Sequence, residues 1–220
     1  MVFLLLTPWL AVAGDVREEF LPIEDNPNLP RVLLIGDSIS MGYTLPVRKK
    51  LEGEANVHRP AMNCGPTSRG VKHLDEWLGD GDWHVIHFNF GLHDLKVMEE
   101  TGEHQVPIDE YEENLEQMVA RMKQTGAELV WASTTPVPDP VNGPERRAED
   151  VVKYNKVAEA VMREHSVAID DLYEFALPQL EVIQLPENVH FPPEGSEVLA
   201  RQVAESIRQA LVGPKTTGVK

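Results

Sequence analysis

The feature that most constrains the fold is a regular alternation of short apolar runs with longer segments of helical periodicity. Five apolar runs are too short for helices and predict strands, at residues 31–36, 54–60, 82–90, 127–134 and 166–170. Apolar residues that recur every three or four positions predict helices at residues 40–51, 68–78, 107–124, 147–165 and 193–212. Strands joined by helices form parallel sheets covered on both faces, so we expect a three-layer α/β/α sandwich with a five-stranded parallel sheet.

Such a sheet also predicts where chemistry takes place. Its ligands bind beyond the carboxyl ends of the strands. The segments to inspect are therefore residues 36–40, 60–68, 90–94 and the chain from Thr134 onward.

Charge and cysteine content exclude several classes of function. Acidic residues outnumber basic ones by 36 to 20, which gives a net charge of −16. Such a surface repels phosphate backbones and anionic membranes, so we expect no nucleic-acid partner. Cys64 is the only cysteine, which excludes an intramolecular disulfide and a zinc site built on paired cysteines. A single free cysteine is typically a small buried residue, and we do not assign Cys64 as a nucleophile.

The two ends of the chain lack the strand and helix patterns of its middle. Residues 1–13, "MVFLLLTPWLAVA", are uncharged, mostly apolar and end in small residues, which predicts a signal peptide cleaved after Ala13. The stretch is too short to span a membrane, and we expect no stable membrane insertion. We therefore expect a secreted or periplasmic protein, or a cytoplasmic one if the stretch is instead a buried N-terminal segment. Residues 14–30 are an N-terminal extension, 31–212 the folded domain and 213–220 a flexible tail.

Ser38 is the first candidate for chemistry. It directly follows the strand at 31–36, where a hydroxyl would be exposed at the edge of the sheet near the N–H groups of a helix start. A serine is a poor nucleophile unless a base takes its proton. The alternative is a serine that only caps the helix. A phosphate-binding loop is disfavoured because "GDSISMGYT" lacks the lysine that such a loop requires.

His190 is the candidate base. It lies in "PENVHFPPEG", a proline-rich loop before the last helix. Glu187 is three residues upstream, so a short turn could bring its carboxylate to one imidazole nitrogen and leave the other free. A carboxylate placed in this way fixes the tautomer and stabilises the imidazolium that forms during proton transfer. The alternative is an ordinary loop histidine beside an exposed glutamate.

Four segments together resemble a known family. "GDSIS" (36–40), "NCGPTSRG" (63–70), "NFGLHDL" (89–95) and "ENVHF" (187–191) are similar to the four sequence blocks of the SGNH, or GDSL, hydrolases, and they occur in the family's order. The resemblance covers about residues 31–212 and implies the flavodoxin-like SGNH hydrolase fold. It implies that Ser38 is the nucleophile, that His190 is the general base and acid, and that Glu187 orients the histidine.

The resemblance also implies an oxyanion hole. Its donors would be the backbone N–H groups of Ser38 and Gly65 and a side chain from the third block. That block usually reads G-x-N-D, whereas this chain has histidine at the asparagine position, His93. A neutral imidazole carries one N–H and can still donate. Glu187 likewise stands where aspartate is usual. Asp37 and Asp94 belong to the blocks and are expected to support the loops rather than react.

The function implied by this resemblance is hydrolysis of carboxylic esters through an acyl-enzyme, with no metal or organic cofactor. Small acyl groups, such as acetyl on a carbohydrate or another small molecule, are common substrates of the superfamily. Two alternatives remain open: a catalytically impaired carbohydrate-binding protein on the same fold, and an acyltransferase that uses the same acyl-enzyme. Nothing in the sequence specifies the oligomeric state.

Overall fold

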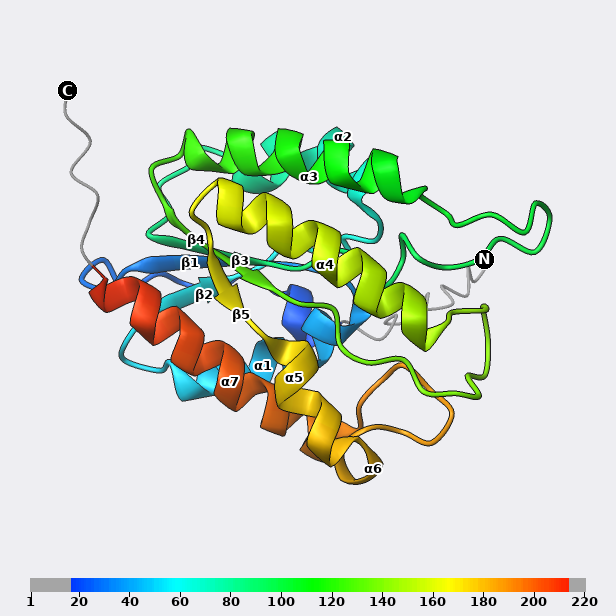
Figure 1. Ribbon diagram of the computed structural model, residues 1–220. Helices are drawn as coiled ribbons and strands as arrows, with labels where there is room; N and C mark the ends of the chain where they lie inside the picture. Colours follow the sequence, from blue (N-terminus) through cyan, green and yellow to red (C-terminus); the bar gives the residue numbers. More distant parts are fainter. Residues whose placement is uncertain (1–16, 214–220) are drawn as a thin grey trace, which may run out of the picture.

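A computed structural model describes residues 17–213 (Figure 1). The predicted signal peptide, residues 1–13, lies outside the described residues, as does the predicted tail from residue 214 onward. The part of the N-terminal extension that is described is held against the start of the second strand. There the backbone N–H of Asn26 donates to the Asn56 side chain at 3.0 Å, and the Asn56 amide donates back to the Asn26 carbonyl at 2.9 Å.

Five parallel strands form one sheet in the order β2-β1-β3-β4-β5. They are β1 (Arg31–Ile35), β2 (Asn56–His58), β3 (Val85–Phe88), β4 (Glu128–Ala132) and β5 (Ala168–Asp170). In register, Val32 of β1 lies beside Val57 of β2 on one side and Val85 of β3 on the other. These valines are almost fully buried, as expected for a parallel sheet covered on both faces. The predicted five-stranded parallel sheet is confirmed.

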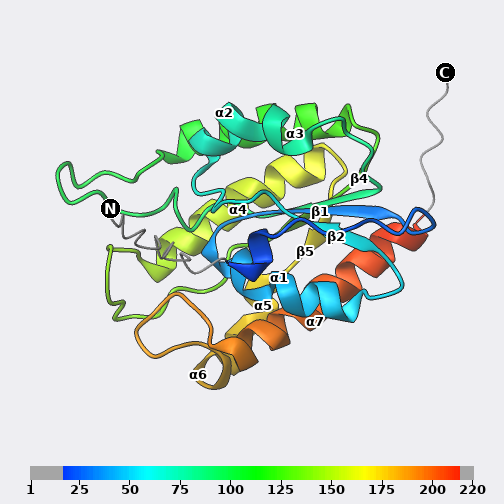
Figure 2. The same cartoon turned by 180° about the vertical axis from the view of Figure 1, so that it is seen from behind.

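Seven α-helices and two short 3₁₀ turns complete the described chain. They are η1 (Glu18–Phe20), α1 (Ser38–Lys50), α2 (Thr67–Leu78), α3 (Ile108–Lys123), α4 (Ala148–Glu164), α5 (Leu172–Ala176), η2 (Leu177–Gln179), α6 (Leu180–Ile183) and α7 (Pro193–Val212). Helices α2, α3 and α4 cover one face of the sheet, while α1 and α7 pack together on the other (Figures 1 and 2). The predicted α/β/α sandwich is therefore confirmed.

Helix α1, which begins at Ser38, is fixed by close packing on α7. A Cβ atom at Gly42 would lie only 2.9 Å from Oγ of Ser196, so a larger residue here would require the Ser196 side chain to move where the two helices approach. At the N-terminus of α1, the Asp37 side chain accepts a hydrogen bond from the backbone N–H of Ile39 at 2.9 Å. The start of α1 is thus held in place both by its neighbour and by its own cap.

The short elements α5 and α6 were not expected from the sequence. Helix α5 has five residues, too few for a periodic pattern to show, and it is capped by Asp171, whose side chain accepts from the backbone N–H of Glu174. None of the described helices combines the length and the apolar character needed to cross a membrane.

Candidate active site

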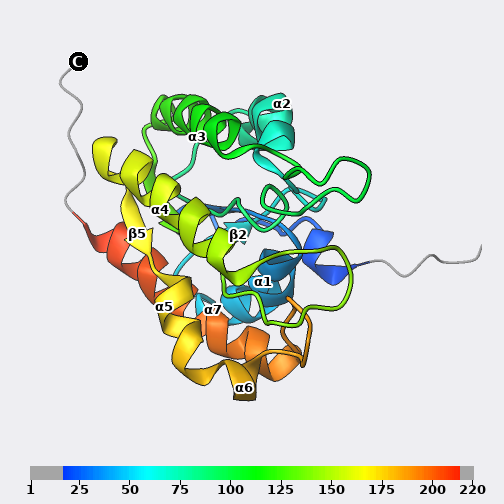
Figure 3. The same ribbon diagram turned by 45° about the vertical axis from the view of Figure 1, so that its right-hand side comes forward.

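Ser38 and His190 meet at the carboxyl edge of the sheet. Ser38 begins α1, two residues after β1 ends, and His190 lies in the loop between α6 and α7. Oγ of Ser38 is 2.9 Å from Nε2 of His190. Figure 3 brings this edge of the molecule forward and shows the loops that follow β3, β4 and α6 gathered around the start of α1. A hydroxyl and an imidazole are thereby in hydrogen-bond contact, which is the arrangement that activates a serine.

Asn188 fixes the tautomer of His190. The backbone N–H of His190 and its Nδ1 atom both approach Oδ1 of Asn188, at 3.0 Å and 2.8 Å. Because the amide oxygen can only accept, Nδ1 must carry the proton. The lone pair of Nε2 is then free to accept the hydroxyl proton of Ser38.

Glu187 does not take the place that the sequence predicted for it. Its backbone adopts a left-handed conformation, with φ of 52°, and its side chain is turned toward Asn142. The Asn142 amide donates to Oε2 of Glu187 at 2.8 Å, and the Asn142 backbone N–H donates to the Glu187 carbonyl at 2.7 Å. In this structure Glu187 therefore joins two loops, and Asn188 is the residue that orients the imidazole.

Gly65 lies in the loop between β2 and α2 with φ of 63°, a left-handed conformation that suits glycine. Its N–H donates to Oδ1 of Asn63 at 2.9 Å. The predicted oxyanion donor is thus occupied in this structure, and it would have to exchange the Asn63 oxygen for a substrate oxygen. The N–H of Ser38 differs, because the first residue of a helix has no carbonyl within the helix to receive its hydrogen bond.

The His93 side chain is half-buried and forms no hydrogen bond with any described residue. Burial is the main cause that lowers its pKa from the ordinary value of 6.5, so the ring is neutral at pH 7. A neutral ring without a protein partner has an N–H to offer. The role of His93 as oxyanion donor, which the family resemblance implies, stays a prediction.

Asp94 is fully buried and connects the loop after β3 to the start of α2. Its Oδ1 atom accepts from the backbone N–H of Thr67 at 2.8 Å and from the Thr67 hydroxyl at 2.5 Å. Oδ2 has no partner among the described residues, and burial raises the pKa of this carboxyl to about 7. Asp37 and Asp94 both contact loop or helix backbone, as expected for supporting residues.

Arg59 is a residue at this site that the sequence did not single out. Its buried guanidinium bridges the turn that carries Ser38 and the loop that leads to Gly65. It donates to five acceptors at 2.8–3.3 Å: the carbonyls of Gly36, Pro60 and Met62 and the hydroxyls of Ser40 and Thr44. No carboxylate partners it in the described part of the chain, and nothing in the local sequence reveals such a set of acceptors.

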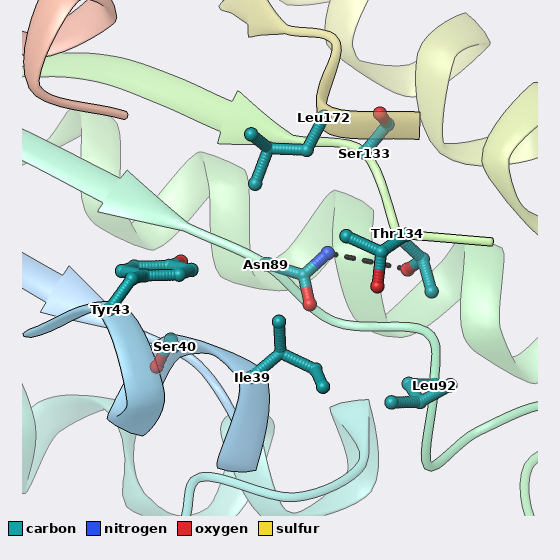
Figure 4. Close-up of a pocket in the computed structure, with 9 residues that line it drawn as sticks. Ile39, Ser40, Tyr43, Asn89, Leu92, Ser133, Thr134 and Leu172 are labelled. Atoms are coloured by element: carbon teal, nitrogen blue, oxygen red, sulfur yellow. Dashed lines mark hydrogen bonds between the residues drawn. The ribbon is translucent and has the colours of Figure 1, made fainter. Parts of the chain in front are cut away.

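A narrow cavity lies next to the first turn of α1, which begins at Ser38 and which we call the nucleophile turn (Figure 4). It is lined by the residues that follow Ser38 in α1 and by the ends of β3 and β4, including Ile39, Leu92 and Asn89. The Asn89 amide donates to the Thr134 hydroxyl at 3.3 Å (Figure 4). The cavity measures about 10 Å³, close to the space of a single water molecule.

Other chemistries find little support among the described residues. Cys64 is buried, and burial raises the pKa of its thiol to about 11, so it is not a thiolate at neutral pH. Between residues 17 and 213, no three His, Cys, Asp or Glu side chains are grouped so as to hold a metal ion.

Comparisons with known proteins point to one family. Residues 34–198 match the GDSL-like Lipase/Acylhydrolase family. No curated protein sequence is significantly similar to this chain.

Three solved structures share the fold, each with a TM-score of 0.69. A lipase/acylhydrolase from Enterococcus faecalis is 21% identical over 81% of this chain and 95% of its own. Axe2, an acetylxylan esterase from Geobacillus stearothermophilus, is 17% identical over 81% and 94%. The acetyl xylan esterase AlAXEase is 12% identical over 80% and 99%. With the family match covering most of the chain, this protein belongs to the GDSL-like lipase/acylhydrolase family and is a carboxylester hydrolase.

Proposed function

We propose that this protein hydrolyses esters of short acyl groups through an acyl-enzyme formed on Ser38. The observation that carries the proposal is the contact of 2.9 Å between Oγ of Ser38 and Nε2 of His190, with Nδ1 held by Asn188. A base with the correct tautomer in contact with a hydroxyl at a helix start supports this mechanism.

The reaction proceeds in two halves. Oγ of Ser38 bonds to the ester carbonyl carbon while Nε2 of His190 takes the hydroxyl proton. The carbon–oxygen bond to the alcohol then breaks, and His190 gives its proton to the departing oxygen. In the second half, water attacks the acyl-enzyme, His190 takes a proton from it and returns it to Oγ as the acid leaves.

The negative oxygen of each tetrahedral intermediate needs donors. The N–H of Ser38 is available, and His93, in the third sequence block, has an imidazole without a hydrogen-bond partner among the described residues. The N–H of Gly65 becomes available if the intermediate displaces Oδ1 of Asn63. Each such donor is worth roughly 100- to 1000-fold in rate.

One observation supports a short acyl group such as acetyl. Two of the solved structures with this fold are acetyl xylan esterases. An acetylated carbohydrate is the substrate class that we propose on this ground.

The test combines covalent labelling with kinetics. A fluorophosphonate should add to the wild-type protein at Ser38, as read by intact mass and peptide mapping, and should not add to Ser38→Ala. Hydrolysis of p-nitrophenyl acetate should fall to the background rate in Ser38→Ala and persist in Ser206→Ala, a matched change on α7. Unchanged turnover in Ser38→Ala would overturn the proposed nucleophile, and faster turnover of p-nitrophenyl octanoate than of the acetate would overturn the short acyl group.

A further inference from the structure

Three cationic side chains lie beside the loops that carry the proposed oxyanion donors. The guanidinium of Arg69, in the first turn of α2, covers Gly65: a Cβ atom at Gly65 would be 3.1 Å from Nη1 of Arg69. Nε of Arg146 donates to the carbonyl of Leu92, the residue before His93, at 2.7 Å. Lys96 lies on the turn that follows His93, and its backbone N–H donates to the His93 carbonyl at 3.3 Å.

These cations form no salt bridge with any described residue, although the chain carries 36 acidic residues against 20 basic ones; the carboxylate whose charge acts on Arg146 is that of the buried Asp37. In the described part of the chain, none of the three forms a salt bridge, whereas six other arginines do: Arg17, Arg31, Arg121, Arg147, Arg163 and Arg208. Glu145, the direct neighbour of Arg146, pairs instead with Arg147 at 2.6 Å. An acidic protein that leaves three cations unpaired at one place has a concentrated positive potential there.

The two guanidinium groups also keep most of their donors free. Arg69 donates from Nη1 to the Asn63 carbonyl at 3.1 Å. Arg146 donates to the Leu92 carbonyl and, at 3.4 Å, to the Pro144 carbonyl. A guanidinium has five N–H donors in a planar fork, and those left over suit a carboxylate or phosphate, which accepts two of them at once.

The charges of these side chains reach the active site. After burial, the causes that lower the pKa of His93 are Arg146, Lys96 and Arg69, while Asp37 acts in the opposite direction. Asp37 is buried as the cap of α1. Asp94, the direct neighbour of His93, is fully buried and bound to Thr67, while Glu187 lies on the His190 side and is bound to Asn142. The cationic side chains therefore lie on the side of the oxyanion donors, where the neighbouring carboxylates are buried.

We propose that the natural substrate is an anionic ester, whose carboxylate or phosphate group is bound by Arg69 and Arg146 with Lys96 nearby. The proposal rests on the esterase function proposed above and adds one requirement to its substrate, a negative charge on the acyl part or on the alcohol part. The guanidinium forks hold this anion while Ser38 attacks the neighbouring carbonyl, and the paired esters below distinguish the two positions of the charge. Binding of this kind also steers the substrate toward a protein that otherwise repels anions.

The test compares esters that differ in one charge. On the alcohol side, 4-acetoxybenzoate is compared with 4-acetoxybenzamide, and 4-acetoxyphenyl phosphate distinguishes phosphate from carboxylate. On the acyl side, monoethyl succinate is compared with ethyl levulinate, which has the same length without the charge. The readout is the ratio of kcat/KM for the anionic and neutral esters. A ratio is used because it cancels any loss of folded protein in a variant.

We expect a ratio of at least about 10 in one pair, falling toward 1 as NaCl rises from about 20 mM to about 0.5 M. The ratio should drop several-fold in Arg69→Met and in Arg146→Met. It should persist in Arg201→Met, an exposed arginine on α7 in the opposite layer. Ratios of 1 or less in both pairs, or ratios that the Arg69 and Arg146 variants leave unchanged, would overturn the proposal. If neutral esters are hydrolysed without any preference, only the anionic substrate is refuted. If Ser38-dependent hydrolysis is absent for all of these esters, the esterase proposal fails as well.

Discussion

Nδ1 of His190 lies 2.8 Å from the amide oxygen of Asn188, while the carboxylate of Glu187 is bound to Asn142. An amide oxygen fixes the tautomer of the ring as a carboxylate would, but it adds no negative charge to stabilise the imidazolium. The histidine of this site is therefore oriented without the electrostatic support that an acid provides.

This relationship predicts a lower kcat/KM for one substitution at Asn188 and a shifted pH–rate profile for another. Asn188→Ala removes the acceptor of Nδ1 and should lower kcat/KM about tenfold, which corresponds to roughly 1.4 kcal/mol for one hydrogen bond. Asn188→Asp adds a negative charge beside the ring and should raise the pKa of the acidic limb of the pH–rate profile. The measurement is kcat/KM for p-nitrophenyl acetate between pH 4 and 9. Glu187→Gln, which keeps the hydrogen bond to Asn142, should leave the acidic limb in place. A shift in Glu187→Gln with none in Asn188→Asp would show that Glu187 is the partner during catalysis.

His93 provides a second prediction. If its N–H stabilises the oxyanion, His93→Ala should lower kcat by about 100- to 1000-fold with little effect on KM, because the interaction is made in the transition state. His93→Asn restores an amide donor and should recover most of that loss. Comparing the two variants on p-nitrophenyl acetate distinguishes loss of the hydrogen-bond donor from loss of the side chain's packing. Equal losses in both would argue that His93 acts by packing alone.

The fold could be predicted from the sequence because periodicity and strand length are local signals. The apolar run at 31–36 and the spacing of Tyr111, Leu115 and Met118 predict their elements directly. Orientation within the site is not local. Spacing alone could not decide between Glu187 and Asn188, because the choice depends on the left-handed backbone at Glu187 and on Asn142, 45 residues away.

Contacts made across the fold were beyond the sequence for the same reason. Arg59 is bound by acceptors on α1 and on the loop before α2, which only the folded chain brings together. The sequence also could not predict that Arg69 and Arg146 form no salt bridge, because the chain has many acidic residues that could have paired with them.

Asp94 predicts how stability depends on pH. Burial raises the pKa of its carboxyl from 3.8 to about 7 in the folded protein. Between these values the folded state keeps the proton that the unfolded chain has released. The contribution of Asp94 to stability is thus fully present below about pH 4 and is lost as pH rises through 7, by an amount on the order of 4 kcal/mol. Asp94→Asn has no titrating group, so the difference in unfolding free energy between wild type and variant should fall as pH rises. Urea titrations at pH 4.5, 6 and 8 measure it, and a difference that stays constant would contradict the raised pKa.

Arg59 predicts a coupled loss of stability and rate. Arg59→Met fills a similar volume but removes five hydrogen bonds, among them the one to the Met62 carbonyl, whereas the Gly36 carbonyl keeps the backbone N–H of Cys64 at 3.2 Å. The free energy of unfolding should therefore fall by about 3 kcal/mol or more. Because the guanidinium joins the nucleophile turn to the Gly65 loop, kcat per folded molecule should fall while KM changes little. Active-site titration with the fluorophosphonate gives the folded, reactive fraction. Arg59→Lys keeps the charge but cannot span all five acceptors, and it should lie between Arg59→Met and wild type in kcat. A full kcat in folded Arg59→Met would mean that the bridge serves stability alone, because the nucleophile turn and the loop would then hold their relative position without it.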